Sequence, residues 1–170
     1  MLDDNLINRK ADKLQEELKN WRRKIHKNPE LAFNETATSD FITTKLKEFG
    51  IEYKKLSGTG VVGLIKGDKE GKTLAIRADI DALAITEKND VDYKSQNEGV
   101  MHACGHDGHT AILLGTAKIL SEMKEDIKGN IKLIFQPAEE GPGGAKPMIE
   151  QGVLENPKVD YIIGLHINPD

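Results

Sequence analysis

The chain has 170 residues, of which 38% are hydrophobic and 31% are charged, with a formal net charge of −4. These values are typical of one soluble globular domain with a real core, or of one domain and a fragment. The small negative charge, without any block of lysine or arginine, argues against a nucleic-acid-binding surface. No apolar run approaches the roughly 18 residues of a membrane span, and no signal peptide is visible. We therefore expect a cytoplasmic protein with no membrane contact.

Two amphipathic helices are predicted in the first 50 residues. Apolar residues recur at steps of three and four from Ile7 to Ile25, and this long helix should end before Pro29, because proline cannot continue it. A second helix is predicted over residues 36–49, with Gly50 as its left-handed stop. Its expected inward face consists of Ala37, Phe41, Ile42 and Leu46.

The pattern then changes to short runs rich in β-branched residues, which predict strands at 61–65, 74–76, 131–135 and 161–165. Where a run is almost continuously apolar, we expect a central strand covered on both faces. A helix between the second and third runs should carry Ile112, Leu113, Thr116, Ile119, Leu120 and Met123 on one side. A short helix should follow Gly144 and carry Met148, Ile149 and Leu154. Strands alternating with helices predict an α/β sheet with helices packed on its faces.

The segment from Met101 to Thr110 holds the chain's single cysteine and three of its five histidines. A lone cysteine cannot form an internal disulfide, so Cys104 either packs as a buried structural residue or takes part in chemistry through its thiol. Cys104 and His106 place a thiolate and an imidazole two residues apart, which suits a borderline-soft divalent metal. We favour a metal site over a buried structural cysteine. Asp107 either orients an imidazole or caps the following helix, and the two roles are compatible.

Several further polar residues have open roles. His102 and His109 are weaker candidates for metal ligands, and His26, in the polar end of the first helix, is expected to be solvated. Asp79 and Asp81 follow a predicted strand and lie on the same side of an extended backbone. They either pair with a neighbouring arginine or take part in catalysis.

Glu139 and Glu140 follow the strand at 131–135, after a proline and before three glycines. Adjacent carboxylates repel each other, and a cation that neutralises one of them makes the pair more tolerable. One can bind a metal while the other takes a proton from a water molecule. The alternative is a solvated turn. His166 also leaves a strand end, and ligands in open α/β sheets gather beyond the carboxyl ends of strands.

Five segments carry a resemblance to a known family, namely residues 22–31, 77–83, 101–110, 136–144 and 164–166. Together they resemble the co-catalytic metal-dependent aminoacylase and carboxypeptidase family. The resemblance is best to its amidohydrolase branch of hippurate hydrolases, N-acyl-amino-acid amidohydrolases and plant auxin-conjugate hydrolases. It implies a zinc-peptidase-like α/β fold, a mixed sheet sandwiched by helices. One local departure is Ala84, where the family usually has proline.

The resemblance also implies a site and a reaction. Cys104 would be the ligand shared by two divalent ions, Mn²⁺ or Zn²⁺, with His106, Glu140 and His166 as further ligands. Glu139 would be the general base and acid. The substrates implied are small N-acyl amino acids, cleaved at the amide bond by an activated water molecule.

Finally, the resemblance implies that residues 1–170 are the N-terminal part of a catalytic domain. The lid or dimerisation domain, the C-terminal catalytic part and a late histidine ligand would lie outside this sequence. Alternatives are a truncated, non-enzymatic metal-binding remnant, a homo-oligomer, or half of an enzyme that needs a complementary chain. A thiol hydrolase with Cys104 as nucleophile would leave the two glutamates and the last histidine without a role.

Overall fold

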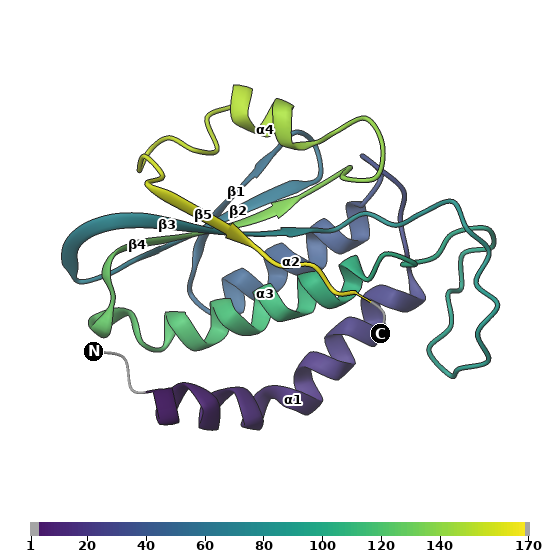
Figure 1. Ribbon diagram of the computed structural model, residues 1–170, viewed down its shortest axis with the longest axis horizontal. Coiled ribbons are helices and arrows are strands. Elements are labelled where there is room, and N and C mark those ends of the chain that lie inside the picture. The colour runs from purple at the N-terminus through teal and green to yellow at the C-terminus, as the bar shows by residue number, and fades with distance from the viewer. Residues whose placement is uncertain (1–3, 169–170) are drawn as a thin grey trace.

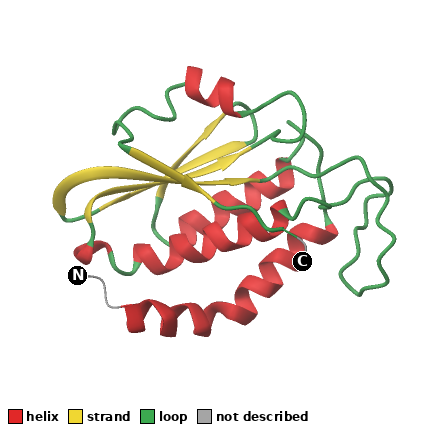
Figure 2. Ribbon diagram, viewed as in Figure 1, coloured by secondary structure: helices red, strands yellow, loops and turns green. Residues whose placement is uncertain are grey.

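The computed structural model describes residues 4–168 as one five-stranded sheet with helices on both faces (Figures 1 and 2). The helices are α1 (Asp4–Lys27), α2 (Thr36–Glu48), α3 (His106–Ser121) and α4 (Ala145–Glu150). The strands are β1 (Glu52–Leu56), β2 (Gly60–Lys66), β3 (Lys69–Asp79), β4 (Lys128–Gln136) and β5 (Tyr161–Gly164). A 3-10 turn covers Lys124–Asp126. The predicted α/β class is confirmed.

The sheet is mixed, with the strand order β1-β2-β4-β3-β5. β2 runs antiparallel to β1 and β4, whereas β3 runs parallel to both β4 and β5. In this register Asp79 lies opposite Gln136, and Arg77 lies opposite Gly164. The carboxyl ends of β3, β4 and β5 therefore meet at one edge of the sheet, where a ligand site is expected.

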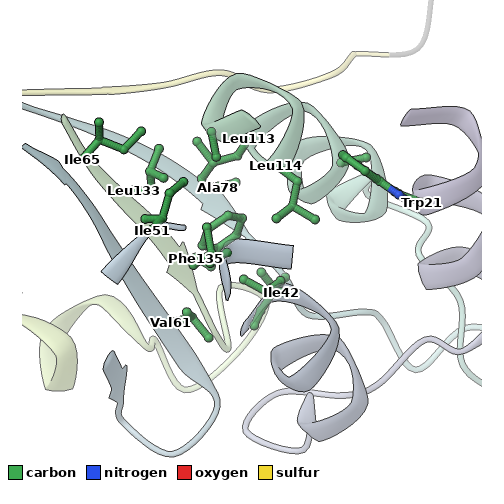
Figure 3. Packing of buried hydrophobic residues seen from close by; sticks show 14 of the residues in the cluster. Trp21, Ile42, Ile51, Val61, Ile65, Ala78, Leu113, Leu114, Leu133 and Phe135 are labelled. Carbon is green, nitrogen blue, oxygen red and sulfur yellow. The ribbon is translucent and has the colours of Figure 1, made fainter. Parts of the chain in front are cut away.

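The main core lies between the sheet and the helices α2 and α3, with α1 packed against α3 (Figure 1). Phe135, Ile42, Leu114 and Leu133 are fully buried there, and Trp21 brings α1 into the same cluster (Figure 3). Burying one such side chain stabilises the fold by about 1.5–3 kcal/mol. A smaller cluster beneath α4 covers the opposite face of the sheet.

The predicted helix ends are confirmed, and their causes are local. α1 ends at Lys27, two residues before Pro29, and Gly50 follows α2 with a φ of 69°. The Glu30 carboxylate caps α2, because it accepts the backbone N–H groups of Ala37 and Thr38 at 2.9 Å each. No helix in residues 4–168 is both long and apolar enough to cross a membrane.

Some sequence expectations are wrong in detail. The edge strand β1 was not predicted, because its Glu-Tyr-Lys-Lys-Leu sequence has no buried apolar alternation. Ala37 is exposed, since the inward face of α2 runs through Thr38, Ile42 and Leu46. The short helix α4 ends before Leu154, which lies in the following turns.

Two apolar surfaces expected to be covered are open in the described part of the chain. β5 is an edge strand rather than a central one, so its side chains are exposed, Ile162 by 55%. Ile112, assigned to the apolar side of α3, is 49% exposed because Leu114 and Ala117 face the sheet instead. These two surfaces are neighbours, because Ile112 and Ile163 line the same hollow.

Candidate metal centre

Four segments bring polar side chains to the edge of the sheet where β3, β4 and β5 end. The structure brings together all four predicted metal ligands and the predicted general base. Three sets of side chains each have ligand atoms that lie within 4.8 Å of one another. The sets are Cys104, His106 and His166; His106, Glu139 and Glu140; and Asp79, His106 and His109.

His106 is common to all three sets and is 1% exposed. Its Nδ1 faces two acceptors, the Asp81 carbonyl at 3.0 Å and the Asp81 Oδ1 at 3.2 Å, so Nδ1 carries the proton and donates. The other ring nitrogen, Nε2, is buried without a hydrogen-bond partner in the described chain. It lies 3.6 Å from Asp79 Oδ1 and 3.8 Å from Glu140 Oε1. An imidazole held in this way presents Nε2 as a metal ligand.

The charges around His106 favour a cation at this place. Burial alone would lower the pKa of His106, but the hydrogen bond to Asp81 and the negative charges of Asp79, Asp81 and Glu140 outweigh it and raise the pKa. A divalent ion would be attracted by the same carboxylates. A thiol, two imidazoles and carboxylates also form a donor set that Zn²⁺ and related ions accept. The residues present therefore fit a metal ion.

Cys104 lies at the open side of the site, with its Sγ 3.3 Å from His166 Nε2. Burial, followed by the nearby carboxylate of Glu140, raises the pKa of the Cys104 thiol to about 12. A thiol with this pKa is protonated at neutral pH, and a protonated thiol is a poor nucleophile. This argues against the thiol-hydrolase alternative. A bound metal ion would displace the proton, because thiolate is the form that binds metals.

The two glutamates lie in the loop that leaves β4. Glu139 is exposed, whereas the Glu140 side chain is 24% exposed and faces His106. The Glu140 backbone N–H donates to Asp81 Oδ2 at 2.9 Å. The single carboxylate of Asp81 therefore holds two predicted ligands, the His106 ring through Oδ1 and the Glu140 backbone through Oδ2.

Replacing Asp81 by alanine should weaken metal binding by about 10- to 100-fold, because both ligands would lose the group that orients them. The measurement is a calorimetric titration of the chain with Zn²⁺. Asp90→Ala removes the same charge from an exposed position and should bind as the unmodified chain does. Equal affinities for the two variants would contradict the orienting role of Asp81.

His109 and Asp79 form a second polar chain behind the ligands. His109 Nδ1 donates to Asp79 Oδ1 at 2.6 Å, and Arg77 binds the other oxygen of Asp79 at 2.7 Å. His109 Nε2 accepts the backbone N–H of Ile167 at 2.9 Å. Since both ring nitrogens are engaged, His109 anchors the segment that carries His166. Asp79 therefore forms an ion pair with Arg77, which was one of the two roles that the sequence allowed for it.

His26 is the main polar residue whose environment sequence reasoning missed. Expected to be solvated, it is 5% exposed, with Nδ1 2.8 Å from Asp107 Oδ2 and Nε2 3.1 Å from Glu87 Oε1. Arg22, one helical turn earlier, donates to the same Asp107 oxygen at 3.0 Å. Asp107 thus orients an imidazole, but that of His26. It does not cap α3, whose N-cap is Gly105 with a φ of 84°.

His102 lies beside this network and is 4% exposed. Neither of its ring nitrogens has a hydrogen-bond partner among the described residues, and burial lowers its pKa to about 4. His102 is therefore neutral at physiological pH. It belongs to none of the three clusters with metal-ligand geometry in residues 4–168.

Comparison with known proteins places the chain in a family. The chain belongs to Peptidase family M20/M25/M40, which it matches over residues 75–170. Among its relatives, thermostable carboxypeptidase 2 of Saccharolobus solfataricus is 54% identical over 160 residues, 89% of this chain and 40% of the relative. Hippurate hydrolase of Campylobacter jejuni is 49% identical over 166 residues, 97% of this chain and 43% of the relative.

A solved structure extends the comparison to the fold. A Bacillus subtilis protein, described as a dinuclear metal binding peptidase from the M20 family, superposes with a TM-score of 0.89 at 44% identity. The match covers 94% of this chain and 44% of that chain. The chain thus spans about two fifths of the length of the relatives it matches.

Proposed function

We propose that this chain supplies the metal-binding and proton-transfer groups of an amidohydrolase that cleaves the amide bond of N-acyl amino acids. The observation that carries the proposal is the unpartnered Nε2 of buried His106, surrounded by a thiol, a second imidazole and two glutamates. The relative named hippurate hydrolase supports the substrate class, because hippurate is an N-acyl amino acid.

We propose further that Cys104, His106, Glu140 and His166 would hold two divalent ions, Mn²⁺ or Zn²⁺. Thiolate and imidazole suit Zn²⁺, and carboxylate also suits Mn²⁺. When bound, the ions supply Lewis-acid polarisation of the amide carbonyl and lower the pKa of a water molecule. A reducing, cytoplasmic setting would keep the thiol available.

Glu139 is proposed as the general base. It is exposed and lies within the same set as His106 and Glu140, so it can reach a water molecule without giving up a structural contact. Its carboxylate takes a proton from the attacking water and passes it to the leaving amine. Glu140, turned toward His106, is left free to bind metal.

A second candidate activity is removal of a C-terminal amino acid from a peptide. The relative named thermostable carboxypeptidase 2 favours it. Both reactions break an amide bond whose nitrogen belongs to an amino acid with a free carboxylate, so the same groups would serve either substrate.

We propose that the complete active site includes polypeptide outside residues 1–170, either a complementary C-terminal part or a second copy. An open hollow of about 390 Å³ supports this, because Ile112, Ile163 and Leu165 line it next to His166. Exposed apolar side chains along an edge strand are a surface that other chains cover.

The test is hydrolysis of N-acetyl and N-benzoyl amino acids and of dipeptides, with added Mn²⁺ or Zn²⁺ and an EDTA-treated control. We expect EDTA to abolish any turnover that is observed and added metal to restore it. Metal binding without turnover by the folded chain would support the metal site and place the activity in a longer assembly. Activity that survives EDTA but is lost to a thiol alkylator would overturn the proposal.

A further inference from the structure

We propose that Glu35 is a positioning residue that sets the conformation of the loop carrying Glu139 and Glu140. Glu35 lies in the connection between α1 and α2, far from the site in sequence, and is 0% exposed. Its Oε1 accepts the backbone N–H of Ala138 at 2.9 Å. Its Oε2 accepts the Thr59 hydroxyl at 2.5 Å. Both oxygens of a buried carboxylate are thus used, one of them at the entrance of the catalytic loop.

The residue that Glu35 contacts has an unusual backbone. Ala138 has a φ of +52°, in the left-handed region that residues with a Cβ rarely adopt. Such a conformation persists only where its surroundings hold it. The next residue along the chain is Glu139, so the direction in which the two glutamates leave β4 depends on the backbone at Ala138.

Three groups hold the loop in place. Glu35 binds the N–H of Ala138 at its start, and Asp81 binds the N–H of Glu140 in its middle. The Ala138 carbonyl closes it by accepting the N–H groups of Gly143 at 3.1 Å and Gly144 at 3.0 Å. Asp81 also binds His106, whereas the hydrogen bonds of Glu35 within residues 4–168 go to Thr59 and Ala138 and not to a predicted metal ligand. Its influence on the site therefore passes through Ala138.

Removal of the Glu35 carboxylate leaves the buried Ala138 N–H without its acceptor. A backbone donor in that position is costly to leave unpaired, so the loop should rearrange until it finds another partner. That rearrangement turns Glu140 away from His106. Weaker metal binding follows, even though every ligand is still present.

The experiment compares Glu35→Ala with Glu35→Gln and with a matched control, Glu30→Ala. The glutamine keeps an oxygen acceptor for Ala138. Glu30 lies in the same connection and also accepts two backbone N–H groups, but those belong to α2. Amide hydrogen exchange at Ala138 in the metal-free chain and Zn²⁺ affinity by calorimetry are measured for all three, with urea unfolding as the record of stability.

For Glu35→Ala we expect at least 10-fold faster exchange at Ala138 and about 10- to 100-fold weaker Zn²⁺ binding, the range typical of residues that support a ligand. Glu35→Gln should retain most of both properties. Glu30→Ala should lose stability while keeping its Zn²⁺ affinity. Ala138→Gly, combined with Glu35→Ala, should recover part of the affinity, because glycine adopts a positive φ without strain.

The inference rests on the proposed metal site, and the two can fail separately. If the unmodified chain binds no Zn²⁺, the proposed site fails, while hydrogen exchange still tests the contact of Glu35 with Ala138. If the unmodified chain binds Zn²⁺ and Glu35→Ala binds it equally well, the positioning role is wrong. Equal losses of Zn²⁺ affinity in Glu35→Ala and Glu30→Ala would mean that Glu35 stabilises the fold in general and does not position the loop. Should Glu35→Ala not fold, Glu35→Asp gives the same comparison with a carboxylate one carbon shorter.

Discussion

Glu139→Gln should retain bound metal and lose turnover by about 10²- to 10⁴-fold, the range for removal of a general acid–base group. Glu140→Gln should instead lose metal, by more than the roughly 100-fold that marks the upper range for a residue that only supports a ligand. The reason is geometric. Glu140 Oε1 lies 3.8 Å from the unpartnered Nε2 of His106, while the Glu139 side chain is exposed.

The measurement pairs a Zn²⁺ titration with hydrolysis of an N-acyl amino acid by whichever assembly proves active. Glu150→Gln on the exposed face of α4 removes the same charge and is the matched control. It should change neither property. If both loop variants bind metal as tightly as the unmodified chain does, the division of roles between Glu139 and Glu140 is wrong.

His26→Ala should destabilise the fold by about 3–5 kcal/mol, the cost of removing one member of a buried ion pair. The imidazole of His26 lies between two carboxylates, Asp107 and Glu87, whose side chains are 0% and 1% exposed. Without it, Glu87 loses its cationic partner, and Arg22 is the cationic partner that Asp107 keeps within residues 4–168. Urea unfolding of the metal-free chain measures the loss.

This destabilisation should depend on pH in a defined way. The hydrogen bond to Asp107 raises the pKa of His26 above its ordinary value of 6.5, so the contribution of His26 is complete below pH 6.5 and is lost as the pH rises through the raised pKa. For Glu87, burial is outweighed by hydrogen bonds from Ser95 and His26, which lower its pKa below 4.5. Its contribution is present above pH 4.5 and is lost on acidification. The difference in the free energy of unfolding between the unmodified chain and His26→Ala should be largest between about pH 4.5 and 6.5.

Lys118→Ala is the control for the loss of stability expected in His26→Ala. Lys118 pairs with Glu17 across the exposed sides of α3 and α1 at 2.8 Å, and such surface pairs contribute about 0–1 kcal/mol. Its effect should be small and flat between pH 5 and 8. A His26→Ala variant with an equally small effect would mean that the buried network contributes no net stability.

The sequence predicts this protein best where local periodicity or local chemistry decides the structure. The helix that ends before Pro29 and the strand run at 131–135 follow from patterns within a few residues, and both are confirmed. The parallel alignment of β3 with β4 then brings residues that follow these strands to one edge. The resemblance to the metal-dependent aminoacylase family implies Cys104, His106 and Glu140 as metal ligands, and the gathering of ligands at strand ends supports the same grouping.

Long-range contacts account for what the sequence did not predict. His26 and Glu35 look like ordinary polar residues of a helix end and a connection, yet both are buried, and each binds a group that lies 60 or more residues away. No periodicity records which carboxylate will meet a distant backbone N–H. The exposure of β5 likewise depends on its place in the strand order rather than on its apolar sequence.

The position of His166 gives the proposed metal a consequence for folding as well as for chemistry. His166 follows a four-residue edge strand, and the segment after it is tied to α3 by the bond from Ile167 to His109. A metal ion held by His166, Cys104 and His106 would cross-link that strand end to the start of α3. Ligand binding to the native state alone stabilises it by about 2.7 kcal/mol at a free concentration 100 times the Kd. In this chain such a gain would act on an edge strand whose one partner in residues 4–168 is β3, so metal uptake and the ordering of that edge would be one coupled equilibrium.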